Sequence, residues 1–341
     1  MTVTNRQWLL RRRPEGAVSV DDFEYRESKI PVPRDGEVLI RSLYFGYDAS
    51  QRILISEQGG YMPAVEIGAP MRTLGVGQIR ESRNPAYARG DLVIGILTWE
   101  DYVLGPIDGP MKLEIIPKAD YPLSWNLGVM GVGGLTAYFA LTDILKVRPT
   151  DTVLISAATG ATGSIAGGIC KAMGVKQVIG LGGGADKCRW ITEMAHYDAA
   201  IDYKNDDVAA RLRELSPGGI DVYLDNVGGD ILDLALEQMA PRGRIAISGA
   251  ISTGYSTMNI PGAKNFMHVL TKMLQLKGIL LFYYRDRLQE GRKSLSRWIA
   301  EGKICVEEEI VEGFENAPGL LPTLFSGKRP GKLLLKVADP F

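Results

Sequence analysis

The pattern of apolar and polar positions changes near the middle of the chain. Up to about residue 125, short apolar runs such as 37–41 and 91–97 are interrupted by Gly and Pro. This pattern is typical of β-strands joined by turns and loops. From about 128 to 300, apolar runs alternate regularly with amphipathic stretches. That alternation predicts β–α units around a parallel sheet, and hence an α/β chain with two domains.

The alternating part predicts six strands with helices between them. The predicted strands are 153–156, 177–181, 200–203, 220–224, 244–248 and 278–282. The predicted helices are 164–173, one from about Asp186, 206–215, 231–239, 264–275 and 286–301. This order matches a Rossmann domain, a doubly wound six-stranded parallel sheet.

The last residues of the chain again show a pattern typical of β-strands, with an apolar run at 332–337. We expect it to rejoin the first domain, so that the alternating domain is an insertion. The expected domains are therefore a β-rich domain of residues 1–127 and 302–341 and a Rossmann domain of residues 128–301.

The most informative motif lies between the first predicted strand and its helix. It reads A-x-G-x-x-G, with Ala158 where a first glycine usually stands, followed by Gly160 and Gly163. Gly160 would let the backbone approach a pyrophosphate, and Gly163 would let the helix pack closely on the strand. The helix N-terminus would offer free N–H groups to the phosphates. Because strand, turn and helix stand in the required order, the motif indicates a dinucleotide site. A buried turn without a ligand is the alternative.

The residues after the second predicted strand indicate which dinucleotide binds. An NAD-specific site usually carries Asp or Glu there, but residues 181–185 read L-G-G-G-A. Lys187 and Arg189 follow, and Tyr203 ends the next strand. Positive charge near the adenosine ribose favours a 2′-phosphate, so the sequence predicts NADP(H) over NAD(H). We expect Asp186 to oppose the helix dipole rather than to bind a ribose.

Composition excludes several classes of partner. The 341 residues carry a formal net charge of −1, which argues against nucleic acid or an anionic membrane as the main partner. No apolar run reaches the roughly 18 residues of a membrane span, and no secretory signal is expected at the start. The three scattered cysteines, Cys170, Cys188 and Cys305, fit a reducing cytoplasm.

Histidine and cysteine positions bear on metal chemistry. The two histidines, His196 and His268, lie in the second half, and the first 150 residues contain no Cys or His. A catalytic zinc in this architecture needs such ligands from the β-rich domain, so we expect no metal site. This argues against a zinc alcohol dehydrogenase. It also leaves a Ser-His-Asp site only if one of these histidines, which we expect to be structural, takes part.

Motifs along nearly the whole chain resemble those of one family. They are 30–39, 61–63, 67–71, 99–102, 134–138, 157–163, 225–229, 249–252, 301–304 and 312–318. The chain resembles the zinc-independent medium-chain dehydrogenase/reductase superfamily, in the branch of leukotriene/prostaglandin reductases, alkenal double-bond reductases and curcumin reductases. The resemblance implies a GroES-like β-rich catalytic domain beside the Rossmann domain.

The resemblance also implies a homodimeric NADPH-dependent reductase of the C=C bond in α,β-unsaturated aldehydes and ketones. Lys187 and Tyr203 would hold the 2′-phosphate, and the glycine turn would hold the pyrophosphate. The cofactor-binding residues that it implies are Thr136, Gly160, Ala161, Thr162, Gly163, Lys187, Tyr203, Asn226, Ser248, Gly249, Ala250, Ile251, Ser252, Ile279, Leu280 and Phe282.

Tyr255, the nearest match to a family tyrosine, is the candidate catalytic residue. Hydride would pass to the β-carbon, and negative charge would build on the carbonyl oxygen. A hydroxyl donor aimed at that oxygen, alone or with the ribose 2′-OH, would stabilise the charge. Tyr255 or water would then protonate the α-carbon. The alternative is that Tyr255 only packs on the edge of the cofactor.

The candidate substrate-binding residues are Ser50, Arg52, Tyr61 and Trp99. Ser50 stands where the family has a pocket tyrosine, Val132 replaces a family methionine, and Arg329 replaces an asparagine that contacts the cofactor. Two of these departures indicate a reshaped substrate pocket, and the Arg329 change puts one cofactor contact in doubt. Two alternatives stay open, a surface ion pair for Arg52 and a core position for Trp99.

Two rival functions also stay open. One is quinone reduction by the same cofactor, and the other is an NADPH-binding sensor without turnover. Oxidation of a hydroxyl would need a general acid–base or a metal that the sequence does not supply.

Overall fold

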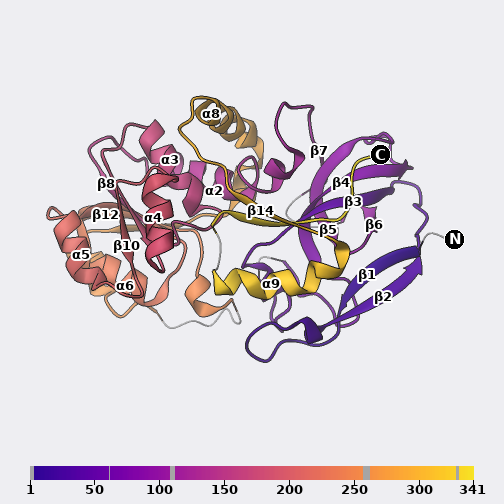
Figure 1. Cartoon of the computed structure of the whole chain (residues 1–341), viewed down its shortest axis with the longest axis horizontal. Helices are drawn as coiled ribbons and strands as arrows, with labels where there is room; N and C mark the ends of the chain where they lie inside the picture. The colour runs from indigo at the N-terminus through magenta and orange to yellow at the C-terminus, as the bar shows by residue number, and fades with distance from the viewer. Residues whose placement is uncertain (1–3, 61, 108–111, 256–261, 328–329) are drawn as a thin grey trace.

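The computed structural model describes residues 4–60, 62–107, 112–255, 262–327 and 330–341. Figure 1 shows two lobes, one built on antiparallel strands and the other on a parallel sheet with helices on its faces. Separate clusters of buried side chains fill the two lobes, and this agrees with the α/β class that the sequence predicts.

The first lobe contains a seven-stranded sheet in the order β14-β15-β3-β4-β5-β7, with β6 paired to β3. The strands are β3 (Val38–Gly46), β4 (Arg72–Ser82), β5 (Leu92–Thr98), β6 (Tyr102–Gly105), β7 (Glu114–Ile115), β14 (Glu308–Glu312) and β15 (Lys332–Lys336). The tail strand β15 pairs antiparallel with β3, so both ends of the chain contribute to this lobe.

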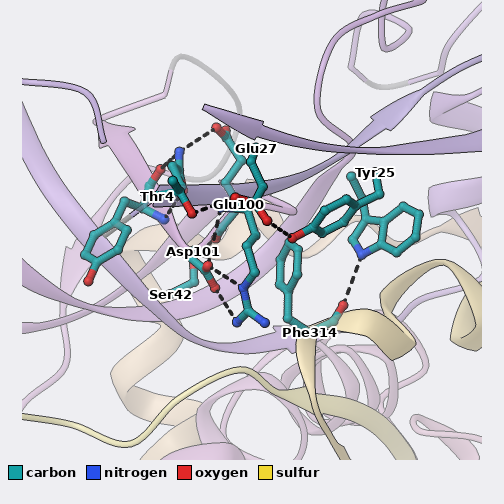
Figure 2. Close-up of polar contacts among 11 residues, drawn as sticks. Thr4, Tyr25, Glu27, Ser42, Glu100, Asp101 and Phe314 are labelled. Carbon is teal, nitrogen blue, oxygen red and sulfur yellow. Dashed lines mark hydrogen bonds and ion pairs between the residues drawn. The ribbon is translucent and has the colours of Figure 1, made fainter. Parts of the chain in front are cut away.

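A separate hairpin of β1 (Thr4–Leu10) and β2 (Phe23–Lys29) completes the first lobe. Figure 2 shows the polar contacts that hold it. The Arg6 guanidinium donates to both carboxylate oxygens of Asp101 at 2.7 and 3.0 Å, and the Trp8 indole donates to the carbonyl of Phe314 at 3.1 Å. These contacts tie together segments far apart in the sequence, and we assign them a structural role.

The second lobe contains a six-stranded sheet in the order β10-β9-β8-β11-β12-β13, in which all neighbours are parallel. The strands are β8 (Thr152–Ile155), β9 (Gln177–Gly182), β10 (Ala199–Asp202), β11 (Ile220–Asp225), β12 (Met239–Ile247) and β13 (Gln275–Gly278). The chain proceeds outward from β8 to β10 and then returns to β11 on the other side of β8. The predicted Rossmann order is confirmed, and it places a topological switch point between β8 and β11.

Helices cover both faces of this sheet and the junction between the lobes (Figure 1). They are α2 (Val132–Phe139), α3 (Gly163–Ala172), α4 (Ala185–Glu193), α5 (Val208–Leu215), α6 (Gly229–Gln238), α7 (Met267–Thr271) and α8 (Leu288–Ala300), with α1 (Gln51–Leu54) and α9 (Ala317–Ser326) in the other lobe. Local chemistry explains their starts where a cap is present. The Asp207 carboxylate, for example, accepts the Ala210 N–H at the start of α5.

The end of the Rossmann domain departs from the predicted elements. The predicted helix 264–275 is only the short α7, and the sixth strand is β13, earlier than the predicted 278–282. The 3₁₀ helix η5 (Leu281–Arg287) takes the last two residues of that predicted strand. The prediction was wrong because Met267 and Leu270 of α7 are exposed and, of its apolar side chains, only Val269 packs against the core, so little packing supports a longer helix. Pairing with β12 instead fixes β13.

Candidate cofactor and substrate site

The glycine turn connects β8 to α3 at the carboxyl end of the parallel sheet. A Cβ on Gly163 would lie 2.2 Å from the Ala157 carbonyl oxygen, and one on Gly133 of α2 would lie 2.7 Å from that of Ala161. Both positions therefore require glycine. In the described part of the chain, the N–H groups of Ala161 and Thr162 donate to no carbonyl, and both residues are partly exposed. This turn fits a pyrophosphate, as the sequence predicts.

Basic side chains gather where an adenosine ribose would lie. A Cβ on Gly183 would lie 2.8 Å from the Tyr203 hydroxyl and 3.0 Å from Lys204 Cε, so both side chains cover this glycine. The pKa of the half-buried Lys187 is lowered, mainly by burial and further by the charge of Lys204. Among the described residues, neither of these two ammonium groups forms an ion pair with a carboxylate, and such a pair of cations fits a 2′-phosphate. Sequence analysis missed Lys204, although it directly follows Tyr203.

The nearest carboxylate, Asp202 at the end of β10, is already used by the protein. It accepts the N–H groups of Gly184 at 2.8 Å and Lys204 at 3.0 Å. Its pKa is lowered, mainly by a hydrogen bond from the Asn205 side chain. Asp202 therefore holds the turn at Gly184 and the turn at Lys204 together through backbone hydrogen bonds.

At the switch point, two loops are joined by backbone hydrogen bonds. The N–H groups of Ser248 and Gly249 donate to the Asp225 carbonyl at 2.7 and 3.2 Å, and the N–H of Ser252 donates to the Val227 carbonyl at 3.1 Å. The Asn226 side chain donates to the Ser156 carbonyl at 2.8 Å. This network brings predicted cofactor residues that follow β11 and β12 to one edge of the sheet, beside the end of β8.

Tyr255 ends the described part of the second loop. Its φ is +52°, an uncommon conformation for a bulky residue. Its hydroxyl accepts the Ala250 N–H at 2.8 Å, which leaves the phenolic proton available for another acceptor. Burial raises the pKa of Tyr255, and the charges of Asp225 and of Asp48 in the other lobe raise it further. The phenol is therefore protonated at neutral pH and lies near the junction.

The remaining predicted cofactor residues lie around the same edge. Thr136 is one turn after Gly133 in α2, which places it toward the glycine turn. Ile279 is buried and its N–H donates to the Ile247 carbonyl, whereas Leu280 is exposed and Phe282 is half-buried. Because β13 ends at Gly278, these three residues follow the strand instead of forming it.

The structure gives two candidate substrate residues other roles. Trp99 is fully buried in the core against Phe23 and Tyr47, which is the core alternative that the sequence left open. The Arg52 guanidinium is also buried, and it donates to the carbonyls of Pro14 and Gly16, which corrects both expectations for it. Neither side chain lines an open surface.

Ser50, Tyr61 and Arg329 are the other positions that the sequence analysis connected with the pocket or the cofactor. Ser50 precedes α1 and is half-buried. Tyr61 and Arg329 lie outside the described residues.

A cavity of about 210 Å³ lies between the lobes, between the β7 region and α8. A smaller adjoining hollow shares Ile94, Glu114 and Arg292 with it and reaches Val132 and Leu281. The position where the family has a methionine therefore lines a hollow beside the end of the parallel sheet.

Within the described ranges, no three His, Cys, Asp or Glu side chains are grouped so that they would hold a metal ion. No helix in the same part of the chain has the length and apolar character needed to cross a membrane.

Two family models match this chain. One is described as the N-terminal domain of oxidoreductase and matches residues 6–113, and the other is described as zinc-binding dehydrogenase and matches residues 161–299.

Similar proteins match over almost the full length. The NADPH-dependent curcumin reductase of Escherichia coli K12 is 37% identical over 98% of this chain and 97% of its own length. The NADP⁺-dependent 2-alkenal reductase of Nicotiana tabacum is 33% identical over 98% of both chains. The crystal structure of CurA in complex with NADPH from Vibrio vulnificus has a TM-score of 0.89 at 35% identity and covers 98% of this chain and 100% of that one. The chain therefore belongs to the medium-chain dehydrogenase/reductase superfamily, in the branch of NADPH-dependent alkenal, prostaglandin and curcumin reductases.

Proposed function

We propose that this protein uses NADPH to reduce the C=C bond of α,β-unsaturated aldehydes and ketones. The observation that carries the proposal is the arrangement at one edge of the parallel sheet. The glycine turn, the Lys187–Lys204 pair and the described part of the loop up to Tyr255 all lie there. Family membership supplies the type of reaction.

The residues present fit NADP(H). Gly160 to Gly163 would hold the pyrophosphate, Lys187, Tyr203 and Lys204 the 2′-phosphate, and residues 226 and 248–252 the nicotinamide half. The stretch 279–282 and Thr136 would border that half. When bound, NADPH supplies the hydride that the β-carbon of the substrate accepts.

Tyr255 would stabilise the negative charge that develops on the substrate carbonyl oxygen. Its hydroxyl accepts a hydrogen bond from Ala250, so it is held in place while its own proton is free to donate. In a site shielded from water, such a donor stabilises an oxyanion far more than it would in solution. The α-carbon is then protonated by Tyr255 or by water.

The departures from the family pattern bear on which carbonyl compounds bind. Val132 is shorter than the family methionine and borders the hollow between the lobes, and Ser50 is smaller than the family tyrosine. Both side chains are smaller than those of the family pattern. We therefore propose a pocket whose preferred enal or enone differs from those of typical family members.

A screen of acceptors tests the function. NADPH oxidation is measured with 2-alkenals, with cyclic and aryl enones, and with quinones at matched concentrations. We expect turnover of the enals or enones, with a saturated carbonyl product identified by mass spectrometry. Turnover of quinones alone would favour the quinone reductase alternative, and tight NADPH binding without oxidation of any acceptor would favour a sensor.

We also propose a homodimer built on the outer edge of the Rossmann sheet. In the described structure, β13 is the last strand of the sheet, so no further strand from the described residues pairs with its outer backbone groups. Beside it, exposed apolar side chains form what we call the α7 patch: Phe266, Met267, Leu270, Met273 and Tyr283. A second copy related by a two-fold axis would pair the two β13 strands and cover both patches.

Three further proposals concern organisation and environment. We place the domain limits at 1–127 with 302–341 and at 128–301, because β14 and β15 join the first sheet. We propose that catalysis needs no zinc, since Tyr255 supplies the electrophilic group.

The three free cysteines support a reducing compartment such as the cytoplasm.

A further inference from the structure

Asp225 is a buried carboxylate at the switch point that the proposed mechanism does not use. It is 0% exposed and ends β11, beside the end of β8. Its Oδ1 accepts hydrogen bonds from the Ser156 hydroxyl at 3.1 Å, the Tyr223 hydroxyl at 2.7 Å, and the N–H groups of Val227 and Gly228, both at 2.9 Å. Its Oδ2 has no hydrogen-bond partner among the described residues.

Two other buried aspartates, Asp22 and Asp151, have ion-pair partners that Asp225 lacks. Asp22 pairs with Arg12, and Asp151 pairs with Arg244. No Lys, Arg or His in the described ranges forms an ion pair with Asp225, so its charge is balanced only by neutral dipoles on one oxygen. A buried charge in that state is costly unless a charge of opposite sign approaches it.

The surroundings of Asp225 identify where such a charge would come from. Its backbone carbonyl holds Ser248 and Gly249, and its carboxylate holds the N–H groups of Val227 and Gly228. These are the two loops that would border the nicotinamide half of NADP(H). The nicotinamide ring is neutral in NADPH and positively charged in NADP⁺, and the two forms carry the same phosphates.

We propose that Asp225 favours the oxidised cofactor through its electric field and so makes bound NADPH a stronger hydride donor. This inference rests on the proposed function, because it takes NADP(H) as the cofactor. Asp225 is a positioning residue in this role, since it is buried beneath the loops and touches neither substrate nor cofactor. Its effect is a lower ratio of the NADP⁺ dissociation constant to the NADPH dissociation constant.

Neighbouring charged groups do not supply the same effect. Lys187 and Lys204 lie at the 2′-phosphate position, which is the same in both forms of the cofactor. Asp48 is paired with the buried Lys332 through a 2.6 Å contact, so this pair adds little net charge. Tyr255 remains neutral at pH 7 because burial raises its pKa.

The test is the variant Asp225→Asn in the full chain. Asparagine keeps an oxygen at the Oδ1 position for the four donors and removes the charge. Dissociation constants for NADP⁺ and NADPH are measured separately by titration calorimetry. We expect NADP⁺ to be weakened about tenfold relative to NADPH, as one charge acting across a partly screened interior would give. That ratio corresponds to a rise of about 30 mV in the reduction potential of the bound cofactor.

Two further variants separate charge from packing. Tyr223→Phe removes one donor to Asp225 but keeps the charge, so the preference for NADP⁺ is expected to persist or increase. Asp151→Asn removes a buried carboxylate from the amino end of the same sheet and is expected to leave the ratio unchanged.

The measured dissociation constants distinguish an effect of the Asp225 charge from a purely structural role. Equal weakening of both forms in Asp225→Asn would show that Asp225 only shapes the loops, and it would overturn the proposal. If that variant does not fold, a fall in NADP⁺ preference in Tyr223→Phe would overturn it as well. Failure of the unmodified chain to bind either dinucleotide would instead contradict the proposed function.

Discussion

At the scale of single residues, Tyr255 combines a costly backbone conformation with a defined hydrogen bond. Left-handed backbone angles in a bulky residue cost roughly 1–3 kcal/mol and persist only where the surrounding structure fixes them. Here the loop is fixed by Asp225, Asn226 and Val227, and the phenol is held by the Ala250 N–H. Such strain in the loop beside the cofactor site is the observation that favours a functional role over simple packing.

Replacing Tyr255 by Phe tests that role. We expect turnover of an enone to fall at least tenfold, or about 1.4 kcal/mol in barrier height, because the donor to the carbonyl oxygen is lost. Steady-state kinetics at saturating NADPH measure the effect, and NADPH affinity is expected to change little. Tyr283→Phe, at an 81% exposed tyrosine, serves as the control. Unchanged turnover in Tyr255→Phe would remove this residue from the mechanism.

Lys187 gives a second prediction at this scale. Lys187→Gln is expected to weaken NADPH binding about tenfold or more, because a charge-assisted contact to the 2′-phosphate is lost, and to leave NADH binding unchanged. Fluorescence titration with both cofactors measures the difference. The exposed Lys264→Gln is the control, and equal loss for both cofactors would contradict the assignment.

The same lysine predicts a pH dependence. Burial and Lys204 lower the pKa of Lys187 in the free protein, and a bound phosphate favours its charged form. Binding therefore takes up a proton when the pH lies above the lowered pKa. NADPH affinity of the unmodified chain is expected to fall as pH rises from neutral through the pKa of Lys187. Lys187→Gln should lose this slope.

At the scale of elements, the short segments after β12 differ most from expectation. The sequence predicted one helix over 264–275, but the apolar side chains of the α7 patch face outward. Periodicity reports that a segment has an apolar face, whereas it does not report what covers that face. An unpartnered apolar face beside an edge strand is what a subunit interface would bury.

Leu270→Glu tests this interpretation. Placing a charge on the α7 patch, at a residue that is 71% exposed, is expected to convert a dimer to a monomer because the interface would bury an unpaired carboxylate. Sedimentation velocity measures the mass of the particle. Val32→Glu, at a 67% exposed site away from the patch, should leave the mass unchanged. A monomer in the unmodified chain would contradict the proposed dimer.

At the scale of the whole molecule, the C-terminal segment connects the two lobes (Figure 1). The Gly331 N–H donates to the carbonyl of Thr159 in the glycine turn at 2.8 Å. The next residue, Lys332, is 3% exposed, and its ammonium donates to the Tyr47 carbonyl and the Asp48 carboxylate in the first lobe. One short segment therefore touches both the predicted pyrophosphate site and the first lobe.

Lys332→Met is expected to lower the free energy of unfolding by about 3 kcal/mol, because it leaves Asp48 and the Tyr47 carbonyl without their cation. Denaturation in urea measures the change. Lys336→Met, which breaks contacts with the exposed Glu312 and Asp339, is expected to cost at most about 1 kcal/mol. Equal losses of unfolding free energy in the two variants would show that the buried Lys332–Asp48 pair stabilises the protein no more than the exposed Lys336 pairs do.

The sequence by itself determined the features that rest on local chemistry. The run of apolar strand, small-residue turn and helix at 153–173 needs only neighbouring residues, and so does the absence of a carboxylate after β9. The alternation of strands and helices then restricts the second lobe to few topologies, because parallel strands need crossover connections. These features led to the Rossmann fold and to the preference for NADP(H).

Only the tertiary structure decided the features that depend on distant partners. Tryptophan and arginine are residue types suited to a substrate pocket. Trp99 is buried instead because it packs against Phe23 and Tyr47, and Arg52 because it donates to the carbonyls of Pro14 and Gly16. The place of β13 depends on pairing with β12, and the uncompensated charge of Asp225 depends on which cations are absent around it in the described structure. No local pattern encodes these properties, because each arises from contacts between segments that the fold alone brings together.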